Sequence, residues 1–190
     1  MSLEPHGSDA PRRRSEAGPA READEPTPSD TGPELLPGVW EIDHTADIGL
    51  SVCAPDAPEL FRRAAWGMQR LTHESVADDG AGSPESEGRR AHGARASRTG
   101  AESRTLVLSA ANLGDLLVAW LRELLYVAEV EGLVLADASF ERLGERQLRA
   151  RVRLTPAAGP AIREVKGVTY HGLEASGDER GFRARVIFDV

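Results

Sequence analysis

The chain has little of several residue types on which common functions depend. It has one cysteine, Cys53, among 190 residues, which excludes an internal disulfide framework and a zinc site built from cysteines. It has one lysine, Lys166, and the residues before it lack the glycine spacing of a Walker A nucleotide-binding loop. No apolar run approaches the roughly 20 residues of a membrane-spanning helix, and residues 1–20 have no hydrophobic centre. We therefore expect a soluble, cytoplasmic protein without membrane contact.

Positive charge is also scarce relative to negative charge. The chain has 31 acidic and 23 basic residues and a formal net charge of −8. Proteins that bind nucleic acid directly usually carry a basic surface, so we expect contact with RNA only through a partner. An acidic chain suits a basic partner, because complementary charge raises the rate of encounter.

Two polar regions interrupt the apolar pattern of the chain. Residues 1–37 and about 73–104 are rich in Gly, Ser, Glu and Arg and poor in large apolar side chains. Such segments bury too little apolar surface to offset the entropy lost on ordering. We predict a disordered N-terminal tail over 1–37 and one domain over 38–190, with a disordered insert at about 73–104.

The remaining sequence predicts two helices. The run from Asp56 to Glu59 has the pattern of a capping box, in which Glu59 reaches back to the helix start, and this helix ends near Leu71. Its arginines, among them Arg62 and Arg63, are interpreted as its solvent face. Asn112 caps the second helix, whose broad apolar face predicts central packing across a sheet.

About seven short segments have the alternation or β-branched content of strands. They are residues 39–43, 48–53, 105–108, 133–142, 147–154, 163–170 and 182–190. Gly167 within one of them suggests a bulge or a close backbone approach. Short links join most of these segments, so we predict an α+β fold, a largely antiparallel β-sheet or sandwich with two α-helices.

The final strand brings two negative groups together. Alternate residues from Phe182 to Val190 are apolar, and Asp189 lies on the opposite face. The Asp189 carboxylate is then a neighbour of the main-chain carboxylate of Val190. Neighbouring carboxylates repel unless a cation or donor lies between them, and Ca²⁺ or Mg²⁺ binds such oxygens. A solvated chain end is the alternative interpretation. Asp47 similarly opens the strand at 48–53 on its polar face.

Three blocks of sequence, in order along the chain, together resemble the archease family. Residues 43–49 (DHTADIG) resemble its opening signature, and residues 117–126 (LVAWLRELLY) resemble its second helix. Residues 166–171 (KGVTYH), followed by 186–190 (VIFDV), resemble its closing signature. The resemblance extends from about residue 40 to residue 190, and the polar tail and insert are the departures from it.

This resemblance implies a protein cofactor with no catalytic residues of its own. Archeases assist the RtcB-type RNA ligase, which joins a 2′,3′-cyclic phosphate or 3′-phosphate end to a 5′-hydroxyl in tRNA splicing and RNA repair. They promote guanylylation of the ligase's active-site histidine and its multiple turnover. The family also implies a divalent metal site, whose ligands map onto Asp47, Asp189 and Val190. Ca²⁺ is the first expectation, with Mg²⁺ or Mn²⁺ as alternatives.

Five further residues have two interpretations each. Asp43 and His44 either support the metal ligands or cap a turn. Lys166, Tyr170 and His171 either line the same rim and face the partner or have plain surface and packing roles.

Two other functions remain open at this point. One is a chaperone or specificity modulator of an RNA-modifying methyltransferase. The other is a small metal-dependent phosphoesterase using Asp47 and Asp189, which would need a general base or nucleophile within reach. No compact motif in the sequence supplies one.

Overall fold

The computed structural model describes residues 32–43, 47–73, 100–159 and 161–190. Its strands are β1 (Glu34–Leu36), β2 (Val39–Asp43), β3 (Ile48–Ala54), β4 (Glu102–Ser109), β5 (Leu133–Leu143), β6 (Gln147–Pro156), β7 (Gly167–Asp178) and β8 (Gly181–Asp189). Its helices are α1 (Ala57–Thr72) and α2 (Leu113–Glu131).

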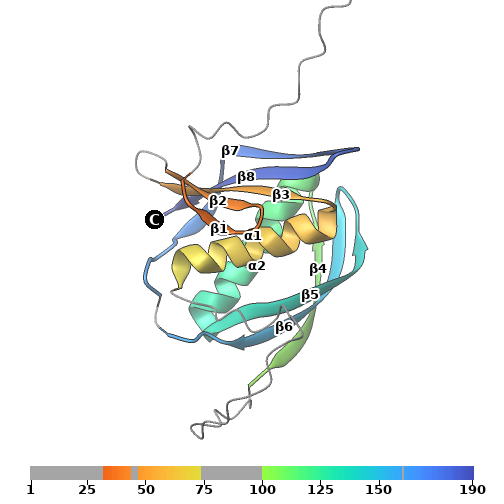
Figure 1. Cartoon of the computed structure of the whole chain (residues 1–190). Coiled ribbons are helices and arrows are strands. Elements are labelled where there is room, and N and C mark those ends of the chain that lie inside the picture. The colour runs from red at the N-terminus through yellow and green to blue at the C-terminus, as the bar shows by residue number, and fades with distance from the viewer. Residues whose placement is uncertain (1–31, 44–46, 74–99, 160) are drawn as a thin grey trace, which may run out of the picture.

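The strands form two antiparallel sheets with the helices between them. The first sheet, called sheet A, has the order β1-β2-β3-β8-β7, and the second, called sheet B, has the order β4-β6-β5. Figure 1 shows α1 and α2 enclosed by the two sheets, where α1 contacts β3 and β5 and α2 contacts β7 and β5. The predicted α+β fold with two helices and antiparallel sheet is thus confirmed, and its sandwich has a helical middle layer.

The helix ends follow the capping residues in the sequence. The Asp56 carboxylate accepts from the backbone N–H of Glu59 at 2.7 Å, and the Asn112 side chain accepts from that of Asp115 at 2.9 Å. Gly132 ends α2 in the left-handed conformation with φ of 67°. These side chains and this glycine satisfy backbone groups that a helix end leaves unpaired.

The expectation that Arg62 and Arg63 form a solvent face of α1 is wrong, because both side chains bond to strand carbonyls. Arg62 donates to the carbonyl of Ala138 at 3.2 Å and Arg63 donates to that of Cys53 at 2.7 Å. The Glu59 carboxylate, expected to reach back to the cap, accepts from both arginines instead. The reason is that α1 has a sheet on each side, so arginines flanking its apolar stripe reach strand carbonyls.

An aromatic cluster joins the layers at the centre of the core. The ring of Trp120 lies 6.4 Å from that of Phe61 and 5.4 Å from that of Phe140, measured between centroids. The Trp120 indole N–H donates to the carbonyl of Phe61 at 3.0 Å, so its polar atom is satisfied in full burial. This contact fixes α2 against α1 and β5.

The boundaries of the polar regions differ from those expected. β1 lies within 1–37, because Leu35 and Leu36 pack against the core beside β2, and a three-residue strand is too short to show periodicity. β4 begins at Glu102, within the expected insert, because its polar first residues pair with β6. Residues 1–31 and 74–99 lie outside the described residues, so the division into tail, domain and insert stays a prediction.

β7 also begins and bends at positions other than those predicted. It starts at Gly167 and runs through residues 173–175 to Asp178. Its irregularity lies between Thr169 and Glu174, where Gly172 has φ of 61°. A Cβ on Gly167 would meet no atom within 4 Å, so that glycine is not a point of close approach.

Across the described residues, no helix has the length and apolar character that crossing a bilayer requires.

Candidate metal centre

The pairing of β3 with β8 directs Asp47 and Asp189 toward the same end of sheet A. β3 and β8 pair with Ile48 opposite Phe188, and both of these side chains pack into the core. Continuing this register by one residue places Asp47 opposite Asp189, on the outer face of the sheet. Cross-strand neighbours have Cβ atoms about 4.5–5.5 Å apart. Asp47 is half-buried and Asp189 is exposed, and at this cross-strand spacing their oxygens would be within reach of one cation.

Val190, next to Asp189, brings a main-chain oxygen to the same end of sheet A. The Val190 side chain packs against the core, and its main-chain oxygen accepts from the ammonium of Lys166 at 3.0 Å. The backbone N–H of Lys166 donates to the carbonyl of Asp189 at 2.7 Å, which extends the β7–β8 ladder by one residue. Lys166 thereby fixes the main-chain oxygens of Asp189 and Val190 at the start of β7.

The donor set fits a hard divalent cation. Two side-chain carboxylates and a main-chain carboxylate supply oxygen ligands, which Ca²⁺, Mg²⁺ and Mn²⁺ prefer. Among the residues that the structure describes, no group of three or more His, Cys, Asp or Glu side chains is placed to hold a metal. The proposed set has three anionic groups only when the main-chain carboxylate of Val190 is counted with the two aspartate side chains. Water would complete the coordination. That these residues bind metal stays a prediction.

The opening signature contributes two more predicted residues, of which little is described. Asp43 ends β2 and pairs with Ile48 of β3. Ile48 directly follows Asp47 in the sequence, so Asp43 lies close to Asp47. The Asp43 side chain and all of His44 lie outside what the structure describes. Their predicted roles as supports of the ligands or as turn caps stay predictions.

β7 carries Tyr170 and His171 on an exposed surface a few residues beyond Lys166. The guanidinium of Arg122, on α2, lies 4.9 Å from the centroid of the Tyr170 ring and donates twice to the Val168 carbonyl, at 3.1 and 2.7 Å. Tyr170 is nevertheless 54% exposed, and such a ring with a cation over it is available to a partner. The partner-facing role of Tyr170 and His171 stays a prediction.

Arg122 was not singled out by sequence reasoning. It lies within the block at 117–126 that resembles the second archease helix, which was the available signal. Arg122 stands beside Glu123 in that block and is exposed, so the sequence did not reveal which strand carbonyl it would meet.

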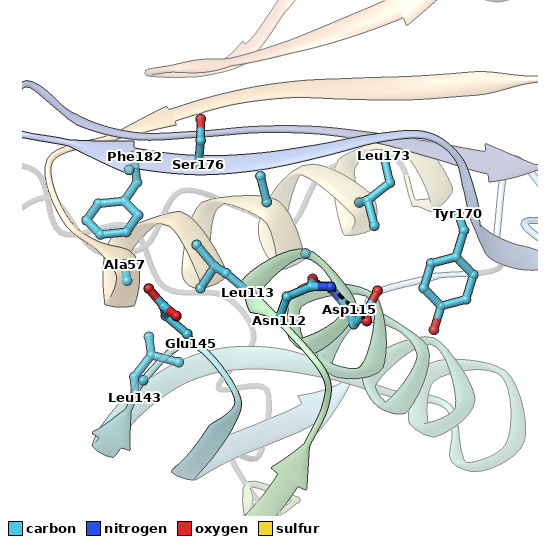
Figure 2. A pocket seen from close by; sticks show the side chains of 14 residues that line it. Ala57, Asn112, Leu113, Asp115, Leu143, Glu145, Tyr170, Leu173, Ser176 and Phe182 are labelled. Carbon is cyan, nitrogen blue, oxygen red and sulfur yellow. Dashed lines mark hydrogen bonds between the residues drawn. The ribbon is translucent and has the colours of Figure 1, made fainter.

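A groove of about 860 Å³ runs along β7 from Tyr170 to Gly177 near the β7–β8 turn (Figure 2). Its walls are largely apolar and come from Leu113, Leu143, Leu173, Ala175 and Phe182. The carboxylate of Asp115 on its floor accepts from the Asn112 side chain at 3.0 Å, so it is engaged in capping α2. The groove therefore offers mainly apolar contact. As a site for a cation, the oxygen-rich end of sheet A is the better match.

The cysteine does not add a nucleophile to this picture. Burial raises the pKa of the Cys53 thiol, and the nearby cations of Arg183 and Arg63 offset only part of that effect. The thiolate is the reactive form, so the thiol is largely protonated at neutral pH.

Comparison with known proteins identifies one family over most of the chain. The sequence model of the Archease protein family matches residues 40–190. Protein archease of Methanosarcina mazei is 29% identical over 156 residues, covering 78% of this chain and 93% of the relative. Protein archease of Methanopyrus kandleri is 27% identical over 158 residues, covering 80% and 99%. The solution structure of protein 1598 of Methanobacterium thermoautotrophicum shares the fold, with a TM-score of 0.55 at 23% identity, covering 82% of this chain and 100% of that chain.

Proposed function

The chain belongs to the archease family, and from that premise we propose that it is a protein cofactor, not an enzyme, of an RtcB-type RNA ligase. In this proposal it promotes guanylylation of the ligase's active-site histidine and multiple turnover during tRNA splicing and RNA repair in the cytoplasm. What supports the proposal is the match over residues 40–190, which includes all three signature blocks.

The proposed metal site is made by Asp47, Asp189 and Val190. The observation that carries it is the β3–β8 register, whose continuation sets Asp47 opposite Asp189. When bound, a divalent cation, Ca²⁺ first and Mg²⁺ or Mn²⁺ as alternatives, supplies positive charge and open positions for oxygen ligands. The ammonium of Lys166 supplies a positive charge beside the main-chain oxygen of Val190.

The residues of the chain itself do the positioning. The backbone bond from Lys166 to Asp189 and its side-chain bond to Val190 fix the direction of the chain end. Arg122 holds the start of β7 against α2 through the Val168 carbonyl. The acidic end of sheet A then meets the ligase as a preorganised surface, and preorganisation lowers the entropy lost on binding.

The charge of the chain suits this partner. A net charge of −8 favours approach to a basic, RNA-binding ligase. Tyr170 and His171 lie on β7 near the acidic end and are proposed to contact the ligase, with RNA held mainly by the ligase itself.

The test is RNA ligation with the cognate ligase present in limiting amount. The substrate carries a 3′-phosphate end and a 5′-hydroxyl end, and product is counted per ligase molecule. We expect several products per ligase only when the protein is added, and little gain from the Asp189→Asn variant. Asp178→Asn, at the opposite end of the β7–β8 pair, removes the same charge and should stimulate normally.

Failure of the wild-type protein to raise turnover would contradict the proposal. Phosphoester hydrolysis by the purified protein alone would instead favour the phosphoesterase alternative. Co-purification with an RNA-modifying methyltransferase, together with no effect on guanylylation, would favour the modulator alternative.

A further inference from the structure

The central strand of sheet B carries a row of arginines on its outer face. Along β6, Leu148, Ala150, Val152 and Leu154 are at most 1% exposed, and the alternate residues between them point to solvent. Those alternate residues are Arg149, Arg151 and Arg153, all exposed. Side chains two apart on a strand are separated by about 7 Å, which is close to the spacing of successive phosphates along a nucleic-acid strand. We call these three residues the arginine row.

The two strands beside the arginine row differ in chemistry. On the β4 side, Ser103 lies opposite Arg153 and Thr105 lies opposite Arg151, so hydroxyl groups flank the cations. The third neighbour on that side is the exposed Val107. On the outer face, the acidic residues lie on the β5 side, where Asp137 pairs with Arg153 and Glu141 accepts from Arg149 and Arg151. Glu102 of β4 pairs with the inward Leu154 and forms an ion pair with Arg104. Among the described residues that face outward, the track between β4 and β6 therefore combines cations with hydroxyl donors, without a carboxylate.

The acidic neighbours leave the arginines available. Glu141 lies 2.8 Å from Arg149 and 3.5 Å from Arg151, but these side chains are 42–67% exposed. Exposed pairs of this kind contribute little to stability, so exchanging one for a phosphate costs little. One oxygen of Asp137 already accepts from the N–H of Ala138. Among the described residues, no ion pair engages Arg153.

We propose that the arginine row binds the phosphate backbone of an RNA strand. A guanidinium donates in a planar fork that matches phosphate oxygens, and serine and threonine hydroxyls donate to the same groups. The outward residues of this face include no aromatic ring, so binding is independent of base sequence. The net charge of −8 led to the expectation that RNA is contacted only through a partner, but that sum does not describe the local field of this face.

The arginine row lies on the opposite side of the molecule from the acidic end of sheet A. The helical layer separates the two sheets (Figure 1), and two layer spacings of about 10 Å each give a separation on the order of 20 Å. Taking the RNA to be the ligase's substrate rests on the proposed function. A structured RNA extends over more than this distance, so one molecule can reach the ligase and this face together.

The test measures RNA binding by the protein without any ligase. Fluorescence anisotropy of a labelled single-stranded RNA is recorded between about 50 and about 200 mM salt. The Arg151→Gln/Arg153→Gln variant should bind about tenfold more weakly or worse. The slope of the logarithm of its binding constant against the logarithm of salt concentration should become shallower by about 1.4, which is about 0.7 for each lost phosphate contact. Thr105→Glu, a single exposed change that places a carboxylate beside Arg151, should also weaken binding.

The matched control is Arg163→Gln/Arg180→Gln, which removes the same charge from exposed positions outside sheet B. It should bind RNA as the wild type does. An equal loss in this control would overturn the proposal, because net charge alone would then explain the effect. Unchanged RNA affinity in the arginine-row variant would also overturn the proposal. If that variant kept its RNA affinity but lost ligase binding, the face would be assigned to a protein partner.

The proposed function is tested separately by ligase guanylylation, a step that involves no RNA. The arginine-row variant should stimulate guanylylation as the wild type does. If the wild type fails to stimulate guanylylation, the proposed function fails, while the anisotropy measurement still tests the arginine row.

Discussion

The ammonium of Lys166 donates to the main-chain oxygen of Val190 at 3.0 Å. This is the single lysine of the chain, and its backbone N–H also bonds the carbonyl of Asp189 at 2.7 Å. The residue that opens the closing signature therefore contacts both residues that end it. The two bonds hold Asp189 and Val190 at a defined position against the start of β7.

Extending the chain beyond Val190 should weaken cation binding. An added Gly-Ser segment converts the main-chain carboxylate into an amide, which removes one of three anionic groups and the partner of Lys166. We expect Ca²⁺ affinity by calorimetry to fall at least about tenfold, the lower bound for groups that merely support a ligand. The same segment at the N-terminus is the control. Equal affinities for the two extended proteins would exclude the Val190 carboxylate as a ligand.

Gly49→Ala should disturb the pairing on which the site depends. A Cβ at Gly49 would lie 2.7 Å from Cδ1 of Ile187 and 2.9 Å from the carbonyl oxygen of Val186, both on β8. Overpacking of this kind costs about 1–3 kcal/mol, and it pushes β8 away from β3 two residues from Asp47. Urea unfolding should show the lower stability, and calorimetry should show weaker Ca²⁺ binding.

Gly167→Ala is the control for that substitution, because a Cβ there meets no atom within 4 Å. It should leave both stability and cation affinity close to wild type. If the two alanine variants behaved alike, close approach of β3 and β8 would not be what holds the site.

Arg122→Met should loosen the start of β7. The substitution removes two hydrogen bonds to the Val168 carbonyl and the contact with the Tyr170 ring. Because the guanidinium is partly exposed, we expect a loss of about 1–2 kcal/mol in the free energy of unfolding. Hydrogen exchange should speed up at residues 168–170, whereas Arg180→Met in the β7–β8 turn should leave these amides protected. Unchanged exchange in the Arg122 variant would show that α2 holds β7 by apolar packing alone.

Arg104→Gln should produce a stability difference that depends on pH. Hydrogen bonds from Arg104 lower the pKa of Glu102 and of Glu131 and raise the pKa of the arginine itself. A carboxyl group whose pKa is lower in the folded state than in the unfolded state stabilises the fold. This contribution is complete at pH values above the unfolded-state pKa of about 4.3, and it disappears as pH falls through the lowered folded-state pKa. Wild type should therefore exceed the variant in stability at neutral pH, and the two should converge below about pH 4. A gap that stayed constant in acid would show that the lost interaction is not ionic.

The local features of the fold were readable from the sequence. Asp56, Asn112 and Gly132 mark helix ends through chemistry that acts within four residues, and the alternation from Phe182 to Val190 separates the faces of β8. These signals depend on neighbours in the chain, which is why they were predicted correctly.

Features that depend on distant partners were not readable. Alternation placed Asp47 and Asp189 on polar faces, but the pairing of β3 with β8 joins segments more than a hundred residues apart. The inward reach of Arg62 and Arg63 depends on a second sheet beyond α1. In each case the missing information was which element lies next to which.

The most direct test of the metal centre is anomalous diffraction from crystals of the protein containing Mn²⁺. The account predicts one anomalous peak within about 2.6 Å of oxygens from Asp47, Asp189 and the Val190 carboxylate, the outer range of hard-cation coordination. An anomalous peak at another position would contradict the proposed metal centre. So would two aspartates that lie apart with no peak between them.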